Sequence, residues 1–392
     1  MSDAFDLVIL GGGCAGLSLS MALATHGQRC PSTLVIEPRT EYTTDRTWCY
    51  WQDRSAPASY PTLHSWQTMR VSHAGKSVSL DCGSTPYHML AAQDFYAAAQ
   101  ASIERQANIT LRQGMSVAGE PSRSGGVWNI RTTAGDVTAR SVVDTRPPQL
   151  PRRDGATLWQ SFYGQEIECS AAVFDPMSMD LMNFLPPDPR HVPFVYFLPV
   201  TPTRALVEVT VFGAAPLEPQ ELSARLEAAV AEHVGGAPFA TLRSEHGILP
   251  MGLNESPRSS HKSSIRVGVM AGSARPSTGY AFQRIQRWSG ECAHALVSCG
   301  HPIGHRPDPL PLRVMDRIFL DVLRADPSRG GALFFSLFSR TDPARVIRFL
   351  SGTADIVDSL EVVAAMPVSP FIRAALALAR RRGRISEIEG VA

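Results

Sequence analysis

Two apolar runs flank a glycine-rich turn at the start of the chain. Residues 5–10 (FDLVIL) are almost entirely apolar, as in a central parallel strand that is buried on both faces. Gly11, Gly13 and Gly16 then follow the G-x-G-x-x-G spacing, and small residues continue through a stretch with helical character. Such glycines permit a tight turn and let the backbone approach a pyrophosphate at the helix N-terminus.

The second apolar run, TLVIEP, ends at Glu37, 21 positions after Gly16. An acidic residue at this distance typically binds the ribose hydroxyls of a dinucleotide. Strand, glycine turn, helix, strand and acid in this order predict a dinucleotide-binding site.

A third apolar run, at residues 265–270, precedes a second loop and another stretch with helical character. Four residues of this loop are candidate cofactor ligands: Gly272, Pro276, Thr278 and Gly279. A strand that returns to the same sheet would bring this loop to the flavin ring of FAD, whereas the simpler interpretation is a Pro/Gly turn. Asp144 ends a further apolar strand, where a fold of this kind usually lets the chain pass near the cofactor, and is therefore a candidate for cofactor contact.

Strict alternation marks residues 204–213 (RALVEVTVFG) as a strand. Glu208 shares one face with Leu206, Thr210 and Phe212, while valines occupy the other face. A buried, unpaired carboxylate costs several kcal/mol, so such a group is paired, neutralised by a raised pKa, or placed on a wetter side of an edge strand. Several strand-like runs between about 156 and 255 predict an antiparallel sheet around it. The aromatic run containing Tyr196 lines a hydrocarbon tunnel or belongs to the core.

The last hundred residues have helical patterns. Asp342 followed by Pro343 predicts a helix N-terminus. Basic and apolar residues alternate in this region and again in FIRAALALARRRGR near the end, which is typical of an ordinary helical domain or of helices at a membrane interface.

Composition excludes some classes of protein. The formal charge of +1 on 392 residues disfavours nucleic acid as a partner. Seven scattered cysteines, with no C-x-x-C pair, indicate reduced thiols in a cytosolic protein and no metal site. The N-terminus does not have a signal-peptide pattern, and no window has the ~18 apolar residues of a membrane span.

The chain resembles the bacterial lycopene cyclases of carotenoid biosynthesis in three separate segments: DRTWCYW, ALVEVTVF and ARPSTGYAF. These flavoproteins are similar in fold to p-hydroxybenzoate hydroxylase and geranylgeranyl reductase. The resemblance runs from residue 5 to about 380. Gly272-Ser273 stands where flavin hydroxylases usually have a Gly-Asp pair, which disfavours an ordinary hydroxylase.

The resemblance implies a lycopene β-cyclase that forms β-ionone rings by proton-initiated cyclisation, with reduced FAD, no net redox change and NAD(P)H as an indirect reductant. Glu208 matches the proposed acid–base residue of the family, and an apolar pocket would keep it protonated near neutral pH. Arg46 and Asp45 match a charged pair beside the flavin. The predicted substrate pocket contains Asp45, Trp48, Tyr196 and Thr210.

Because lycopene is insoluble in water, we expect a cytoplasmic protein that contacts the inner membrane peripherally. The alternatives are a flavin monooxygenase or polyprenyl reductase, and a noncatalytic flavin- or carotenoid-binding protein. The sequence leaves open whether one or both ends of lycopene are cyclised, whether the ring is β or ε, and the oligomeric state.

The predicted fold class is α/β. Residues 1–80, 88–155 and 262–292 are expected to form a discontinuous Rossmann-type FAD-binding domain of the p-hydroxybenzoate-hydroxylase-like fold. Residues 156–261, with 81–87, are expected to form an antiparallel substrate-binding sheet, and 293–392 a helical region in possible contact with the membrane.

Overall fold

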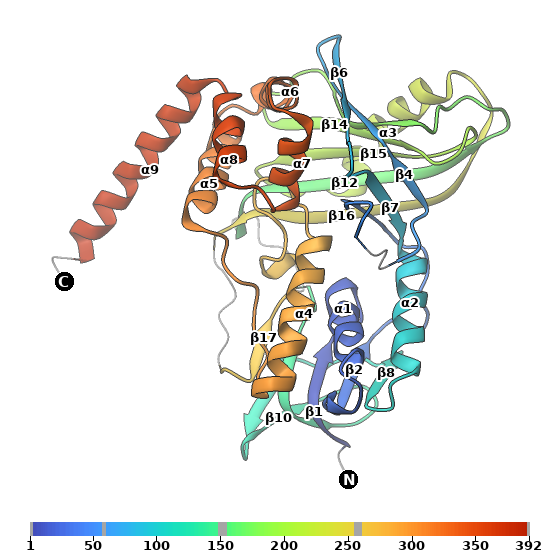
Figure 1. The fold of residues 1–392 in the computed structure, drawn as a ribbon, viewed down its shortest axis with the longest axis vertical. Helices are drawn as coiled ribbons and strands as arrows, with labels where there is room; N and C mark the ends of the chain where they lie inside the picture. Colours follow the sequence, from blue (N-terminus) through green and yellow to red (C-terminus); the bar gives the residue numbers. More distant parts are fainter. Residues whose placement is uncertain (1–2, 57–59, 148–154, 255–260, 390–392) are drawn as a thin grey trace.

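A computed structural model describes residues 3–56, 60–147, 155–254 and 261–389. Two large sheets lie one beyond the other along the long axis of the molecule, and helices from the end of the chain stand beside the second sheet (Figure 1). A three-stranded sheet, made of β3 (Thr47–Trp51), β4 (His64–Trp66) and β7 (Tyr87–Ala91), has strand order β3-β7-β4.

The first sheet carries the glycine turn. Its order is β8-β2-β1-β11-β10-β9, with β17 paired to β11, and β8, β2, β1, β11 and β17 are parallel. The strands are β1 (Asp3–Leu10), β2 (Thr33–Glu37), β8 (Ile109–Gln113), β9 (Ser122–Ser124), β10 (Val127–Ile130), β11 (Val137–Asp144) and β17 (Ser264–Arg266).

Both faces of β1 are buried, as its apolar run predicts. Leu7 and Ile9 belong to the core formed with α1 (Cys14–Ala24), α2 (Ala92–Glu104) and α4 (Phe282–Cys299), whereas Val8 and Leu10 belong to a second core on the opposite face. Short 3₁₀ helices at Gly27–Arg29 and Val269–Ala271 complete this part of the chain.

The second sheet has the order β16-β12-β15-β14-β13-β5-β6. Its strands are β5 (Thr68–His73), β6 (Lys76–Asp81), β12 (Ala156–Cys169), β13 (Ser178–Phe184), β14 (His191–Pro199), β15 (Arg204–Gly213) and β16 (Phe239–Leu253). The valines of β15 pack in one core with α3 (Pro219–Val234), whereas Leu206 and Phe212 belong to a different core, so the alternation in this strand is confirmed.

The predicted domain boundary at residue 80 differs from the strand pairing. β5 pairs with β13, and β6 pairs with β5, so residues 68–81 belong to the second sheet. The short run of polar and apolar residues in these strands does not specify which sheet they join, since that depends on a partner more than 100 residues away.

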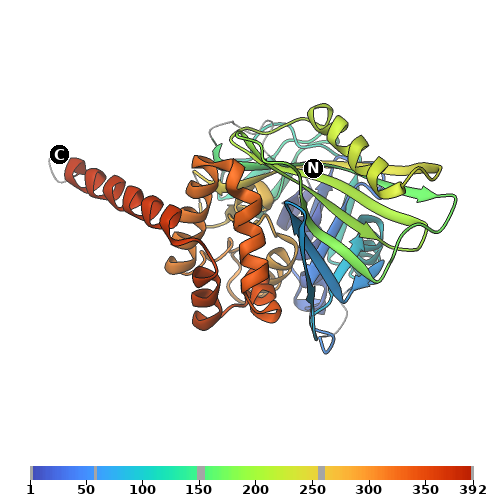
Figure 2. The same ribbon diagram turned by 90° about the horizontal axis from the view of Figure 1, so that it is seen from above.

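Five helices follow: α5 (Leu310–Ala325), α6 (Gly330–Arg340), α7 (Pro343–Ser351), α8 (Ile356–Ala364) and α9 (Val368–Glu389), with a 3₁₀ turn at Pro327–Arg329. The Asp342 side chain accepts hydrogen bonds from the first turn of α7, which confirms the predicted N-cap. Seen from above, α9 extends away from the body of the molecule (Figure 2).

Within the described chain, no single helix has the length and apolar composition needed to cross a membrane. The pair Ile356–Ala364 and Val368–Ala379 meets these two criteria only when taken together, and its helices meet at a bend of 114°. Of the arginines in the basic stretch at 371–384, only Arg373 lies among the residues whose side chains the structure describes.

Candidate functional site

The glycine turn forms a cradle at the N-terminus of α1. Gly11 has a φ of +102°, which favours glycine, and a Cβ on Gly16 would lie 2.0 Å from the Gly11 carbonyl oxygen. A Cβ on Gly13 would meet nothing within 4 Å, and the helix start has no side-chain cap. Space and backbone donors are therefore present where a pyrophosphate would bind.

Glu37 lies at the end of β2 and is 3% exposed. Its carboxylate accepts hydrogen bonds from the Gly12 backbone N–H (2.8 Å), from the Arg39 backbone N–H (2.9 Å) and from the Arg39 guanidinium (2.8 and 3.2 Å). These four donors fill the acceptor positions of a carboxylate. A ribose hydroxyl that bound Glu37 would replace the Arg39 side chain, which is 31% exposed.

Asp45 and Arg46 lie on the nucleotide side of the molecule. Asp45 accepts from Arg39 (3.2 Å), Arg46 and the Tyr96 hydroxyl (3.0 Å). Arg46 is close enough to Cys14, the first residue of α1, to influence its thiol electrostatically. Arg46 is thus near the expected cofactor cradle, whereas Asp45 belongs to this polar cluster and not to the predicted substrate pocket.

The second predicted cofactor loop runs from Gly268 to Tyr280 and precedes α4. Gly272 and Gly279 have φ values of +94° and +74°, and a Cβ on Gly279 would lie 2.4 Å from Gln160 Oε1. The Thr278 hydroxyl and Gln160 Oε1 are buried and have no hydrogen-bond partner within the part of the chain that the structure describes. Buried polar atoms rarely lack a partner, so these two atoms fit a bound polar group.

Ser273 replaces the acid of flavin hydroxylases in this loop. Its hydroxyl accepts from the Gly268 backbone N–H (3.0 Å) and lies 2.5 Å from His305 Nε2. Ser273 therefore bonds to the first residue of this loop and links the loop to the segment before α5.

Asp144 has partners of its own. Both of its carboxylate oxygens accept from Arg146 (2.9 Å each), and one also accepts from Arg266 (3.0 Å), which joins β11 to β17. Although burial acts in the opposite direction, these arginines lower the pKa of Asp144. This geometry gives Asp144 a structural role and offers no support for its prediction as a cofactor residue.

Glu208 lies on the face of β15 that is turned toward β3 and the C-terminal helices. The Thr210 hydroxyl donates to Glu208 Oε1 (2.9 Å). Burial, followed by the negative charge of Glu245, raises the pKa of Glu208 to about 8. The carboxyl group consequently holds its proton at neutral pH.

Glu245 is a second carboxylate on this face, and the sequence analysis missed it. Glu208 on β15 and Glu245 on β16 both lie opposite Gly164 of β12. A Cβ on Gly164 would lie 3.2 Å from Glu208 Cβ, so the glycine leaves room for the two side chains to converge.

Arg243 and Thr47 supply the partners that an ionised Glu245 requires. Glu245 is 3% exposed, accepts from the Thr47 hydroxyl (2.8 Å) and forms an ion pair with Arg243. Arg243 also contacts Glu166 (2.5 Å). Since Glu208 lacks a cationic partner at hydrogen-bond distance among the described residues, the pair is arranged as one ionised and one protonated carboxyl group.

Three tyrosines extend the Glu208 site. Tyr196 of β14 lies directly opposite Glu208, and Tyr280, from the second cofactor loop, is hydrogen-bonded to Tyr196 and Tyr87. Burial raises the pKa of each of the three, so that their hydroxyls stay neutral. The prediction that places Tyr196 and Thr210 beside Glu208 agrees with these contacts, and Tyr280 links the acid to the cofactor loop.

Trp48 points the other way, contrary to its prediction as a pocket residue. On β3, Thr47 bonds to Glu245 and Cys49 is influenced by both carboxylates, whereas Trp48 packs on Phe95 (5.0 Å) and Phe282 (5.7 Å) in the core of the first sheet. Successive strand residues face opposite sides, so Cys49 and not Trp48 faces the acid.

Two sequence comparisons relate this chain to known proteins. The model of the protein family described as "Lycopene cyclase protein" matches residues 6–376. A search of curated proteins finds no significant match.

Solved structures with a similar fold include a flavin-dependent enzyme. A geranylgeranyl bacteriochlorophyll reductase-like protein of Thermoplasma acidophilum has 13% identity and a TM-score of 0.57, covering 95% of this chain and 96% of the other. The p-nitrophenol 4-monooxygenase of Pseudomonas putida has 15% identity and a TM-score of 0.56 over 97% and 98%, and a flavin-dependent brominase has 14% and 0.59 over 96% and 100%. The expected fold class is confirmed.

Proposed function

Because the chain belongs to the lycopene cyclase protein family, we propose that it is an FAD-dependent lycopene β-cyclase. It converts the acyclic ends of lycopene into β-ionone rings, with no net redox change, and is an intramolecular lyase or isomerase. The observation that carries this proposal is the buried Glu208 beside Glu245, which is paired with Arg243, in a site that Tyr280 connects to the cofactor loop.

FAD would lie with its pyrophosphate at the glycine cradle of α1 and its ring near Thr278 and Gly279. The open space at Gly13 and the unpartnered Thr278 hydroxyl support this placement. When bound in reduced form, FAD supplies a fixed negative charge that stabilises a carbocation in a site of low dielectric constant, and no electrons are consumed overall. NAD(P)H is the proposed indirect reductant.

Glu208 performs both proton transfers in this proposal. Its carboxyl group donates a proton to the terminal double bond, a second double bond attacks the resulting cation, and the ionised Glu208 then takes a proton from the new ring. The atoms balance, because one proton enters and one leaves. Thr210 orients the carboxyl group through its hydrogen bond, and Glu245 keeps the proton on it.

The substrate would come from a membrane. Exposed apolar side chains are concentrated on α8 and α9, where Ile356, Val357, Leu360, Val368, Ile372 and Leu376 are each more than half exposed. Exposed apolar surface of this extent favours an interface. We therefore place these helices against the inner membrane, as a peripheral contact of a cytoplasmic protein.

The test is anaerobic incubation of the purified protein with FAD, dithionite and lycopene liposomes in D₂O. The expected product is isomeric with lycopene apart from one deuterium per ring, and the Glu208→Gln variant should retain FAD but lose at least 100-fold in rate. Glu168→Gln, an exposed acid on the neighbouring strand, is the matched control. Unchanged lycopene with reduced flavin bound would refute the proposal, and NADPH consumption in proportion to product would point to an oxidoreductase.

A further inference from the structure

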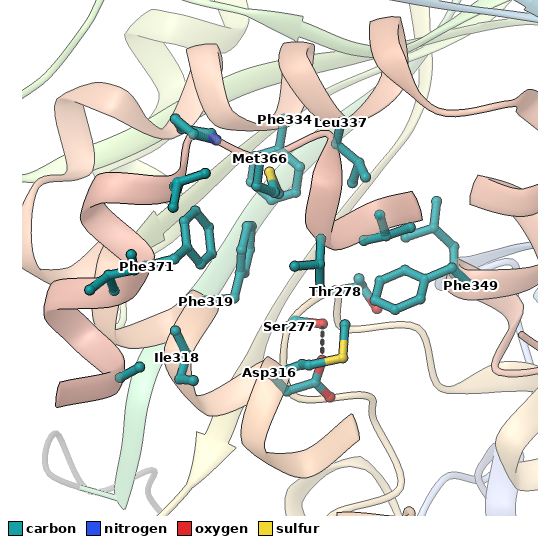
Figure 3. A pocket seen from close by; sticks show the side chains of 18 residues that line it. Ser277, Thr278, Asp316, Ile318, Phe319, Phe334, Leu337, Phe349, Met366 and Phe371 are labelled. Atoms are coloured by element: carbon teal, nitrogen blue, oxygen red, sulfur yellow. Dashed lines mark hydrogen bonds between the residues drawn. The ribbon is translucent and has the colours of Figure 1, made fainter. Parts of the chain in front are cut away.

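A cavity of about 380 Å³ lies between the C-terminal helices and the second cofactor loop (Figure 3). Each of four helices contributes a phenylalanine to its wall: Phe319 of α5, Phe334 of α6, Phe349 of α7 and Phe371 of α9. Its volume is within the range of about 300–1,000 Å³ that is typical of ligand sites.

The few polar groups of the lining gather on one side, where Ser277 and Thr278 meet Asp316. The Ser277 hydroxyl donates to Asp316 (2.7 Å), and Arg275 lies 3.3 Å from the same carboxylate oxygen. The Thr278 hydroxyl and the second Asp316 oxygen have no partner among the described residues, and the rest of the wall offers only apolar contacts. Away from this polar side, the cavity therefore suits a hydrocarbon.

The cavity opens to the surface between α8 and α9. Val363, Val368 and Ile372 line it and are nevertheless 51%, 66% and 53% exposed. Its mouth consequently lies within the apolar surface that the two helices present.

The inner end of the cavity approaches the Glu208 site. Leu350 lines both this cavity and a cleft of about 20 Å³ whose wall includes Cys49 and Tyr280. Cys49 and Tyr280 belong to the group of side chains around Glu208. The cavity and the cleft beside the acid thus share a wall at Leu350.

We propose that this cavity binds the acyclic chain of an isoprenoid hydrocarbon, which enters between α8 and α9 with one end leading toward Glu208. This inference rests on the proposed function for the identity of the ligand. The cavity positions the chain and excludes water, and none of its apolar side chains takes part in proton transfer.

Binding of the fluorescent polyene diphenylhexatriene to the purified, FAD-containing protein, without membranes, tests the proposal independently of turnover. Ala375→Trp fills the cavity from α9, whereas Ala377→Trp makes the same change on the exposed side of that helix. We expect at least a tenfold loss of affinity in the first variant and no change in the second. Squalene, an acyclic isoprenoid, should displace the probe from the unmodified protein.

Equal affinity in the two variants would overturn the proposal, as would displacement by palmitate as effective as that by squalene. If Ala375→Trp loses its flavin or its cooperative melting, Val363→Arg at the half-exposed mouth replaces it, with Ile356→Arg as the control. Binding that responds as expected in a protein that leaves lycopene unchanged would refute the cyclase function and retain the hydrocarbon cavity.

Discussion

Replacing Glu245 by glutamine tests how the protein keeps Glu208 protonated. The variant preserves the shape of the side chain and removes a negative charge, while Arg243 remains close by. Both effects favour the ionised form of Glu208, because the charge of Glu245 raises its pKa and that of Arg243 lowers it. The acid should therefore lose its proton at a lower pH.

The size of the shift follows from the geometry. The two carboxyl groups converge over Gly164. For unit charges about 5 Å apart and an effective dielectric constant of about 20, the interaction is about 3 kcal/mol. One pKa unit corresponds to about 1.4 kcal/mol, so the pKa of Glu208 should fall by about two units.

The assay is the pH dependence of lycopene cyclisation under reducing, anaerobic conditions. A catalytic acid must be protonated, so the rate of the unmodified protein should fall as pH rises through about 8. In Glu245→Gln this decline should be centred at about pH 6, with the rate at lower pH largely preserved. Glu168→Gln removes an exposed negative charge from the same sheet and should leave the profile in place.

An unchanged profile in Glu245→Gln, with FAD still bound, would refute the idea that the carboxyl pair sets the protonation of Glu208. Equal loss of rate at every pH would instead give Glu245 a structural role, since its bond to Thr47 joins β3 to β16.

Three further substitutions test other parts of the site, and a fourth serves as a control. Gly164→Ala introduces a Cβ 3.2 Å from Glu208 Cβ and should lower the rate of cyclisation at least tenfold. Its control, Gly290→Ala, lies on the exposed surface of α4 and should raise the free energy of unfolding by about 1 kcal/mol, as measured by thermal unfolding. Gly16→Ala places a Cβ 2.0 Å from the Gly11 carbonyl oxygen, so the purified protein should lack flavin absorbance. Thr278→Val removes an unpartnered buried hydroxyl; the flavin-free protein should keep its stability within about 1 kcal/mol, while a titration should show weaker FAD binding. Unaltered FAD affinity in that variant would exclude Thr278 as a ligand.

Local patterns predicted much of the fold because each is determined by near neighbours. The apolar run of β1 predicts burial on both faces, alternation assigns the two faces of β15, and Asp342 caps α7. Membership of a sheet is a non-local property, which is why β5 and β6 were assigned to the nucleotide-binding domain when they pair with the second sheet.

The sequence predicts only those site residues that stand out within a single strand. Glu208 stands out in an apolar strand, but Glu245 lies in the polar run RSEH, which is typical of a solvated strand, and only the register across β12 brings the two together. The R-x-E spacing, which puts Arg243 and Glu245 on one face, was the available signal. The prediction for Trp48 is wrong because residues 48–51 are aromatic or apolar on both faces of the strand, so the sequence does not reveal which face meets which sheet.

The apolar core beneath α3 determines where the acid lies. Tyr196, Glu208, Gly164 and Glu245 form one row across four strands. Shifting the register of β15 by one residue would turn each of its side chains to the opposite face of the sheet. Glu208 would then enter the core with α3, and a valine would take its place in the row. Val207, Val209 and Val211 are at most 1% exposed against α3, so such a shift would remove them from this core and bury Glu208 there without Glu245 nearby. The burial that stabilises the sheet therefore also aligns the proton donor with the carboxylate that keeps it protonated.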